Sequence, residues 1–195
     1  QNSLLTSVCQ HSQHQLEDGS LIWLNSNSEV KVEYSKHFRQ IHLLKGEAHF
    51  EVAKDKNRPF EVYAGDRLVR AIGTAFSVYR LDERIEVLVS EGKVELAIVD
   101  ATLVIKPDSY DPITVAQLQQ EMPTYTGVDT KQNLSPVRSS STNILGELVA
   151  GQRVSIPTAN STNKPITIDE IIEVDSSEIT RKLSWREGKL VFAGE

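Results

Sequence analysis

"LLKGEAHFEVAKDKNRPFEV", residues 43–62, predicts the fold because apolar and polar residues alternate along its first half. Successive side chains of a β-strand point to opposite faces, so this alternation indicates a half-buried strand. The apolar face holds Ala48, Phe50 and Val52, and the polar face holds Glu47, His49 and Glu51. Pro59 then opens a second strand, whose first core residue is Phe60. The stretch is therefore a strand–turn–strand unit.

The same pattern recurs through the first hundred residues. It is found in SLIWL (20–24), EVKVEY (29–34), RQIHLL (39–44), PFEVYA (59–64), RIEVLV (84–89) and KVELAIV (93–99). The connections contain Gly, Asp, Asn or Pro and are too short for α/β crossovers, which need a dozen residues or more. We therefore predict an all-β fold of stacked antiparallel hairpins. They would form a sandwich or a solenoid-like twisted double sheet with at most one or two short helices.

The remaining segments differ in character. Residues 106–143 are rich in Pro, Ser, Thr, Asn and Gln and are interpreted as a loop-rich insertion, with one possible short helix at Thr114–Met122. Strands are predicted at residues 146–157 and 166–174. DSSEITRKL (175–183) could form one or two helical turns capped by Asp175 or Ser176. WREGKLVF (185–192) is expected to form a closing hairpin.

Composition excludes several classes of protein. The chain has 195 residues and a net charge of −6, from 27 acidic and 21 basic residues, and no cluster of Lys or Arg. This argues against binding to nucleic acid or to an anionic membrane. Cys9 is the only cysteine, so no intramolecular disulfide can form. No apolar run approaches the ~18 residues that cross a bilayer.

With these stretches in order, the sequence resembles the FecR family of transmembrane sigma-factor regulators. The matching stretches are LEDGSLIWLNSNSEVKVEY (16–34), RQIHLLKGEAHFEVAKDKNRPFEV (39–62), VRAIGTAFSVYRLDERIEVLVSEGKVEL (69–96), LVAGQRV (148–154) and WREGKLVF (185–192). The residues that match the family motifs, expected to be structural, are Asp18, Gly19, Ser20, Gly46, Glu47, Phe50, Pro59, Phe60, Gly73, Thr74, Phe76, Gly92, Gly151, Trp185 and Gly188.

The resemblance implies a domain organisation. Family members have a cytoplasmic anti-sigma segment, one membrane helix and a periplasmic part. The periplasmic part is an all-β FecR domain followed by a small domain similar to the secretin/TonB short N-terminal fold. We expect residues 16–195 to be the FecR-type domain and residues 1–15 to be a linker from a membrane helix that lies before Gln1. The small domain would begin after Glu195.

The resemblance also implies a function. The periplasmic part would receive a signal from the periplasmic signalling domain of an outer-membrane TonB-dependent transporter. The whole regulator would then control an extracytoplasmic-function sigma factor, often for the uptake of iron chelates or glycans. An open sheet edge could accept a strand of the partner. We expect WREGKLVF to lie near such an edge or to dock the C-terminal domain, with Trp185 and Lys189 as candidate partner-binding residues.

Two alternatives depend on particular side chains. Glu47, His49 and Glu51 could bind a metal, since imidazole and carboxylate are ordinary ligands, but we favour a solvated strand face. A second function class is a non-catalytic module for carbohydrate or cell-envelope polymer, with sugars stacked on Trp23, Tyr34, Tyr63 or Tyr79 if those aromatics share one exposed face. We expect no enzymatic activity and no cofactor, because no catalytic triad, dyad or metal-ligand spacing is present.

Overall fold

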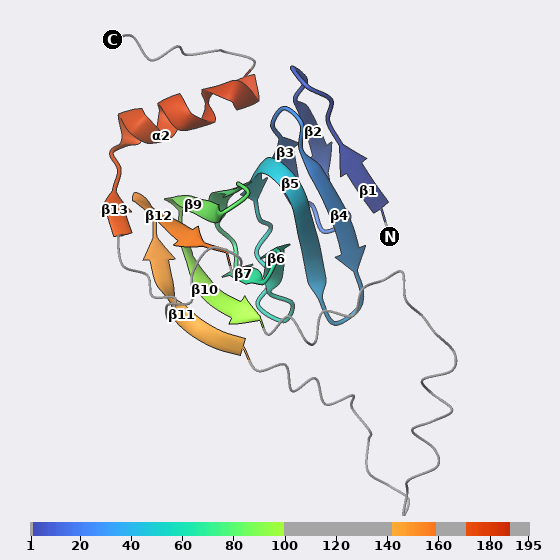
Figure 1. The fold of residues 1–195 in the computed structure, drawn as a ribbon. Coiled ribbons are helices and arrows are strands. Elements are labelled where there is room, and N and C mark those ends of the chain that lie inside the picture. Colours follow the sequence, from blue (N-terminus) through green and yellow to red (C-terminus); the bar gives the residue numbers. More distant parts are fainter. Residues whose placement is uncertain (1, 100–141, 159–170, 188–195) are drawn as a thin grey trace, which may run out of the picture. The chain divides into compact units, whose positions relative to one another are not determined.

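The computed structural model describes residues 2–99, 142–158 and 171–187 (Figure 1). This part contains β1 (Asn2–Leu5), β2 (Ser12–Gln15), β3 (Leu21–Leu24), β4 (Glu29–Tyr34), β5 (Arg39–Glu51), β6 (Phe60–Ala64), β7 (Arg67–Ala71), β8 (Ala75–Arg80), β9 (Arg84–Glu91) and β10 (Lys93–Val99). It continues with β11 (Thr142–Val149), β12 (Gln152–Pro157), β13 (Ile171–Glu173), helix α2 (Ser176–Leu183) and the 3-10 helix η2 (Ser184–Glu187). The predicted all-β class is confirmed.

The strand β5 is thirteen residues long and belongs to two layers of strands. Its first half pairs with β4 and β6, and its second half pairs with β3 and β8. Layer A therefore has the order β1–β4–β5–β6–β7–β10–β11, and layer B has the order β2–β3–β5–β8–β9–β12–β13. One strand thus joins the two layers.

The hydrophobic core lies between the layers. Phe50 of β5 contacts Phe60 of layer A and Phe76 of layer B, with ring centroids 5.6 and 5.2 Å apart. Ala48 is also fully buried, and Val52 is nearly so. The apolar face predicted for residues 48–52 is therefore the core face, and Phe60 begins β6 as predicted.

Two expectations differ from the structure. Residues 1–15 are not a linker throughout, because β1 pairs with β4 and β2 pairs with β3. The side chains of β1 and β2 are largely solvated, although their backbones are hydrogen-bonded in the sheets. Their polar composition therefore did not predict strands. In addition, not every pair is antiparallel, because β5 and β6 are parallel and Arg39 is in register with Phe60.

The C-terminal part of the described chain is helical, as predicted for residues 175–183 but not for residues 185–187, where a hairpin was expected. Asp175 caps α2, and its carboxylate accepts a hydrogen bond from the Glu178 N–H at 2.8 Å, as predicted. Trp185 lies in η2, so the prediction of a strand there is wrong. The short apolar run that suggested the hairpin begins beyond Glu187, and Gly188 and Lys189 lie outside the described residues. The predicted helix at 114–122 and most of the 106–143 insertion also lie outside them.

Gly46 marks the point where β5 passes from layer A to layer B. Its φ is +79°, and a Cβ there would lie 2.7 Å from Ser28 Cα and 2.8 Å from the Asn27 carbonyl oxygen. The Ser28 hydroxyl fills the remaining space, accepting from the Glu47 N–H and donating to the Glu47 carbonyl. Only glycine fits both the backbone angle and the close approach.

Arg39 joins three segments that are separate in the sequence. Its side chain is fully buried, and its Nη1 donates to Asp18 Oδ2 at 2.6 Å and to the Ala53 carbonyl at 2.9 Å. Its Nε donates to the Arg58 carbonyl at 2.7 Å. Arg39 is the first residue of β5 and Ala53 follows its end, so the guanidinium holds β5 in a tight curl.

Asp18 supplies the charge that balances Arg39. Its side chain is 5% exposed and also accepts hydrogen bonds from the Ser20 hydroxyl at 2.6 Å and the Tyr34 hydroxyl at 3.2 Å. Burial raises the pKa of Asp18, but the Ser20 hydrogen bonds and Arg39 outweigh it and hold that pKa below its usual value. The carboxylate is therefore ionised at neutral pH.

We expect Gly46→Ala to destabilise the fold more than Gly19→Ala. Both glycines have positive φ, so each substitution carries a backbone penalty of about 1–2 kcal/mol. Nothing lies within 4 Å of a Cβ at Gly19, whereas the crowding at Gly46 adds a further loss of about 1–3 kcal/mol. Urea unfolding monitored by circular dichroism measures both. Equal losses would contradict the close approach at Gly46.

We expect Asp18→Asn to lower the free energy of unfolding at pH 7 by about 3–5 kcal/mol, because it leaves the buried Arg39 charge unbalanced. The folded pKa lies below the ordinary value of 3.8, so the stabilisation is complete above that pH and is lost as pH falls through the folded pKa. Wild type and variant should therefore converge in strong acid.

Asp55→Asn is the matched control for this measurement. Asp55 forms an ion pair with Arg58 at 2.9 Å and its pKa is also lowered, chiefly by the Arg58 hydrogen bond, but both side chains are partly exposed. A pair in contact with water contributes less than a buried pair, so the urea midpoint should change less than in Asp18→Asn. If Asp18→Asn has the same urea midpoint as Asp55→Asn, the buried pair of Asp18 and Arg39 does not stabilise the fold.

Candidate functional site

Six side chains form a continuous cross-strand row on the outward face of layer B. Cross-strand pairing sets the order, and directly paired residues point to the same face. The outer row consists of Trp23 (β3), His49 (β5), Ser77 (β8), Leu88 (β9), Arg153 (β12) and Ile172 (β13). The sequence neighbours of the first four of these residues are buried in the core. This face therefore offers a polar and aromatic surface on a rigid support.

The helical segment α2–η2 covers the outer row. Glu178 of α2 lies 3.9 Å from Arg153, and Arg186 of η2 lies 5.2 Å from the centre of the Trp23 ring. Arg186 also donates to Glu51 at 3.1 Å. The segment thus contacts layer B near both ends of the row, and Leu183 is its one buried residue within the described range.

His49 is enclosed by this arrangement. Its side chain is 0% exposed, its Nδ1 lies 2.9 Å from the Ser77 hydroxyl, and its ring centre lies 5.6 Å from that of Trp23. Burial, followed by the Arg186 charge, lowers the pKa of His49 to about 3. The imidazole is therefore neutral at physiological pH, and the prediction of a solvated position is wrong. The covering helix, which the alternation could not reveal, is the reason.

The two glutamates beside His49 have different environments. Burial raises the pKa of Glu47, against the opposing effects of a 2.7 Å hydrogen bond from Asn25 and the charge of Lys182. Glu51 is exposed and paired with Arg186. Within the described ranges, no three His, Cys, Asp or Glu side chains are arranged to hold a metal ion. The three residues are instead tied to the cover and to neighbouring strands.

The contact between the cover and layer B contains unpaired polar atoms. Among the described residues, five buried side-chain nitrogen or oxygen atoms have no hydrogen-bond partner. Four lie in this contact, namely His49 Nε2, Arg153 Nε, Trp185 Nε1 and Arg186 Nε, and the fifth is Thr74 Oγ1. The Trp185 N–H lies near enough to Glu47 to offset part of its pKa rise, yet outside hydrogen-bonding geometry. Each unpaired buried group typically costs about 1–3 kcal/mol, so these atoms oppose the association of the cover with layer B.

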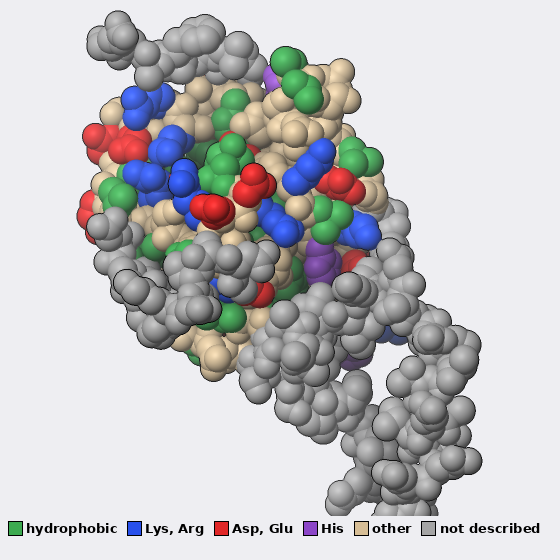
Figure 2. Space-filling view, viewed as in Figure 1, with side chains coloured by type: hydrophobic (Ala, Val, Ile, Leu, Met, Phe, Trp, Pro, Cys, Tyr) green, Lys and Arg blue, Asp and Glu red, His purple; other side chains and the backbone are tan. Residues whose placement is uncertain are grey.

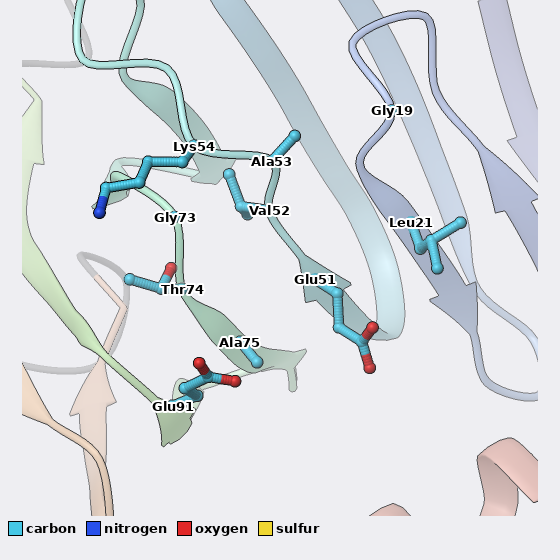
Figure 3. A pocket seen from close by; sticks show the side chains of 10 residues that line it. All are labelled: Gly19, Leu21, Glu51, Val52, Ala53, Lys54, Gly73, Thr74, Ala75 and Glu91. Carbon is cyan, nitrogen blue, oxygen red and sulfur yellow. The ribbon is translucent and has the colours of Figure 1, made fainter.

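A pocket of about 450 Å³ lies beside the cover (Figure 3). Three motif residues, Gly19, Gly73 and Thr74, contribute to its lining. Figure 3 shows Lys54 and Glu91 on one side and Glu51 on the other. The lining contains no His or Cys, and Glu51 is already paired with Arg186. The pocket therefore provides polar surface without a recognisable nucleophile–base pair.

The four aromatic residues considered for sugar stacking do not gather on one face. Trp23 lies under Arg186 on layer B, and Tyr63 stacks on His42 of layer A at 5.1 Å. Tyr34 packs edge-on against Phe60 and donates to Asp18. Tyr79 alone among the four is strongly exposed. This separation does not favour the carbohydrate-binding alternative.

Exposed apolar side chains mark the last strand of each layer. Ile144 of β11 is 63% exposed, while Ile171 and Ile172 of β13 are about 40% exposed. Within the described part of the chain, β11 pairs only with β10 and β13 pairs only with β12. Figure 2 shows basic and acidic side chains interspersed on one face rather than collected by sign. No helix of the described residues has the length and apolar character to span a membrane.

The motif residues within the described ranges occupy four locations in the structure. Asp18, Gly19, Ser20, Pro59 and Phe60 surround Arg39 or adjoin its junction, and Gly46, Glu47, Phe50 and Phe76 lie in β5 and β8. Gly73, Thr74, Gly92 and Gly151 lie in turns between strands, and Trp185 lies in the cover. Sequence reasoning missed Arg39 and Arg186, because a single arginine in a strand or turn normally indicates solvent exposure.

Comparisons with known proteins agree with this architecture. The family model described as "FecR protein" matches residues 2–95. Two crystal structures, at 1.65 and 2.50 Å resolution, of a candidate anti-sigma factor from Parabacteroides distasonis ATCC 8503 align with TM-scores of 0.60 and identities of 21% and 22%. The alignments cover 94% and 93% of this chain but only 65% and 64% of those chains. No curated protein matches. The resemblance predicted from the sequence motifs is confirmed.

We expect Glu47→Gln to raise the free energy of unfolding at pH 7. The folded pKa of Glu47 lies above its ordinary value of 4.5, so ionisation of the buried carboxylate destabilises the fold at neutral pH. The neutral amide of the variant removes this penalty, and its oxygen can still accept from Asn25. The gain should vanish below pH 4.5, where the carboxyl is protonated in both states. Urea unfolding at pH 7 and pH 4 measures it.

Glu51→Gln is the matched control, four residues further along the same strand. Glu51 is exposed and paired with Arg186, so its neutralisation offers no relief from burial. We expect no gain in the urea midpoint. An equal gain in both variants would show that net charge, rather than the burial of Glu47, determines the effect.

Proposed function

From the FecR domain at residues 2–95, we propose that this chain is the signal-receiving part of a membrane-anchored sigma-factor regulator. The domain would lie in the periplasm and bind the periplasmic signalling domain of an outer-membrane TonB-dependent transporter. The sigma factor would be controlled through a cytoplasmic segment of the same regulator. The family match is the observation that carries this proposal, and the partial coverage of the structural relatives is compatible with further domains in the whole protein.

The architecture supports a receiver rather than a catalyst. A relay needs a rigid scaffold with surface available to a protein partner, and this scaffold is anchored by the Arg39 junction and the layered core. The described pocket lacks a nucleophile–base pair, and its carboxylate at Glu51 is engaged by Arg186. Protein binding is therefore the function that the geometry favours.

We propose that the partner adds a strand beside β13. An exposed strand edge presents backbone donors and acceptors that an extended segment can pair with. Ile171 and Ile172 are consecutive and therefore point to opposite faces, and both are exposed, so an added strand would find apolar contacts on each side. The candidate partner-binding residues Trp185 and Lys189 follow β13 closely in the sequence.

Isothermal titration of the chain against the periplasmic signalling domains of TonB-dependent transporters from the same genome tests the proposal. We expect saturable binding to one of them. Ile171→Lys should weaken that binding at least tenfold, since it places a charge at the contact. Ile144→Lys, at the exposed edge of the other layer, is the matched control and should leave binding unchanged.

If the folded chain binds none of these signalling domains, the proposal that the partner is a TonB-dependent transporter is wrong. Binding that is equally sensitive to both lysine substitutions, or to neither, would overturn the β13 contact. Chemical crosslinking from Lys189 to the bound signalling domain would give independent support for placing the partner next to the cover.

A further inference from the structure

The contact between α2–η2 and the outer row combines features of a temporary association. The helix is eight residues long, Leu183 is its one buried residue, and isolated helices of this length are marginal in water. Its ion pair with Arg153 is long, at 3.9 Å, and four buried polar atoms of the contact lack partners within the described residues. The segment is held by a few polar contacts, not by an extensive apolar interface.

The layer beneath the cover does not depend on it. Strands β3, β5, β8, β9 and β12 are joined by continuous backbone ladders, and their inward faces form the main core. Removal of α2–η2 would therefore expose the outer row and leave the sheet intact. The surface uncovered would present Trp23, His49 and Leu88, which is an aromatic and apolar strip suited to a protein partner.

We propose that α2–η2 is a releasable cover and that uptake of a proton by His49 favours its release. In the covered state the imidazole is enclosed between Trp23 and Ser77 and faces the guanidinium of Arg186. A proton on His49 would place two positive charges together in a buried contact. Once the cover leaves, the ring lies on the open face of layer B, where water solvates its charge.

The other charged groups of this contact determine whether the pH dependence of release follows His49. They are Glu47 and Glu51 on β5, Glu86 on β9, Arg153 on β12, Glu178 and Lys182 on α2, and Arg186 on η2. Glu51 is already paired with Arg186, and Glu178 faces Arg153. Protonation of Glu47 has the opposite effect to protonation of His49. Burial raises the pKa of Glu47, so acid favours the covered state through this residue. Glu47→Gln removes that opposition.

The expected effect follows from the two states of His49. His49 has an ordinary pKa of 6.5 when it is uncovered and a pKa of about 3 when it is covered. The equilibrium between the covered and released states therefore shifts toward release by about tenfold between pH 7.5 and pH 5.5. Hydrogen exchange detected by mass spectrometry, corrected for the intrinsic pH dependence of exchange, measures this. In the Glu47→Gln variant, protection of the amides of Ile179–Leu183 should fall about tenfold between pH 7.5 and pH 5.5, while protection of the Phe50 and Val78 amides stays constant.

His49→Asn is the decisive variant, because the asparagine amide can retain the contact with Ser77 but cannot take up a proton. In the Glu47→Gln background, protection of α2 should then become independent of pH. Retention of the pH dependence in the double variant Glu47→Gln/His49→Asn would overturn the role of His49. Protection that is constant with pH in Glu47→Gln, or that falls equally in α2 and in the core, would overturn a releasable cover.

Arg186→Gln tests the cover independently should His49→Asn fail to fold. It removes the contacts with Glu51 and Trp23 but leaves the core untouched. We expect lower protection of α2 at pH 7.5, unchanged protection of Val78, and a smaller dependence on pH because the opposing charge is gone. Unchanged protection of α2 would show that η2 does not hold the cover.

Discussion

The buried pair of Asp18 and Arg39 is the interaction on which the rest of the structure depends. Arg39 fixes the turn between β2 and β3, the segment after β5 and the approach to β6 through one guanidinium. That geometry curls β5, and the curl lets a single strand supply hydrogen bonds to both layers. A buried charge tolerates little displacement, because its hydrogen bonds are directional and its desolvation must be balanced. The same pair therefore stabilises the fold and specifies its geometry.

The glycines and small polar residues around this junction have a common physical role. Ser20 donates to Asp18 and also accepts from the Ala53 N–H, so it connects the turn to the end of β5. Gly46 allows Ser28 to approach the backbone where β5 changes layers. These residues are short because other backbone segments occupy the space that a larger side chain would need. Motifs of this kind describe a scaffold, and the surfaces that recognise partners can vary around it.

The alternation of residues 47–52 was sufficient to predict the strand and its core face, because a strand's two faces follow from its period of two. The recurrence of this pattern over the first hundred residues, with short connections, predicted the all-β class. The parallel pairing of β5 with β6 was not predictable, since it results from the curl that Arg39 holds, a contact between residues far apart in the sequence. His49 was misjudged for a similar reason. Strand patterns distinguish two faces but do not show that a helix much later in the chain covers the polar one. Trp185 lies in a 3-10 helix, where the sequence pattern predicted a strand.

The shared strand β5 has a consequence for how this domain loses its structure. Most two-layered β-domains can in principle open one sheet while the other persists. Here each layer contains half of the same strand, so melting either layer frees one end of a strand on which the other layer is built and exposes the core between them. The domain should therefore have no half-folded equilibrium intermediate, and its two layers should unfold in one cooperative transition. A domain built in this way is either fully folded or fully unfolded, so a partly unfolded sheet does not expose unpaired strand edges.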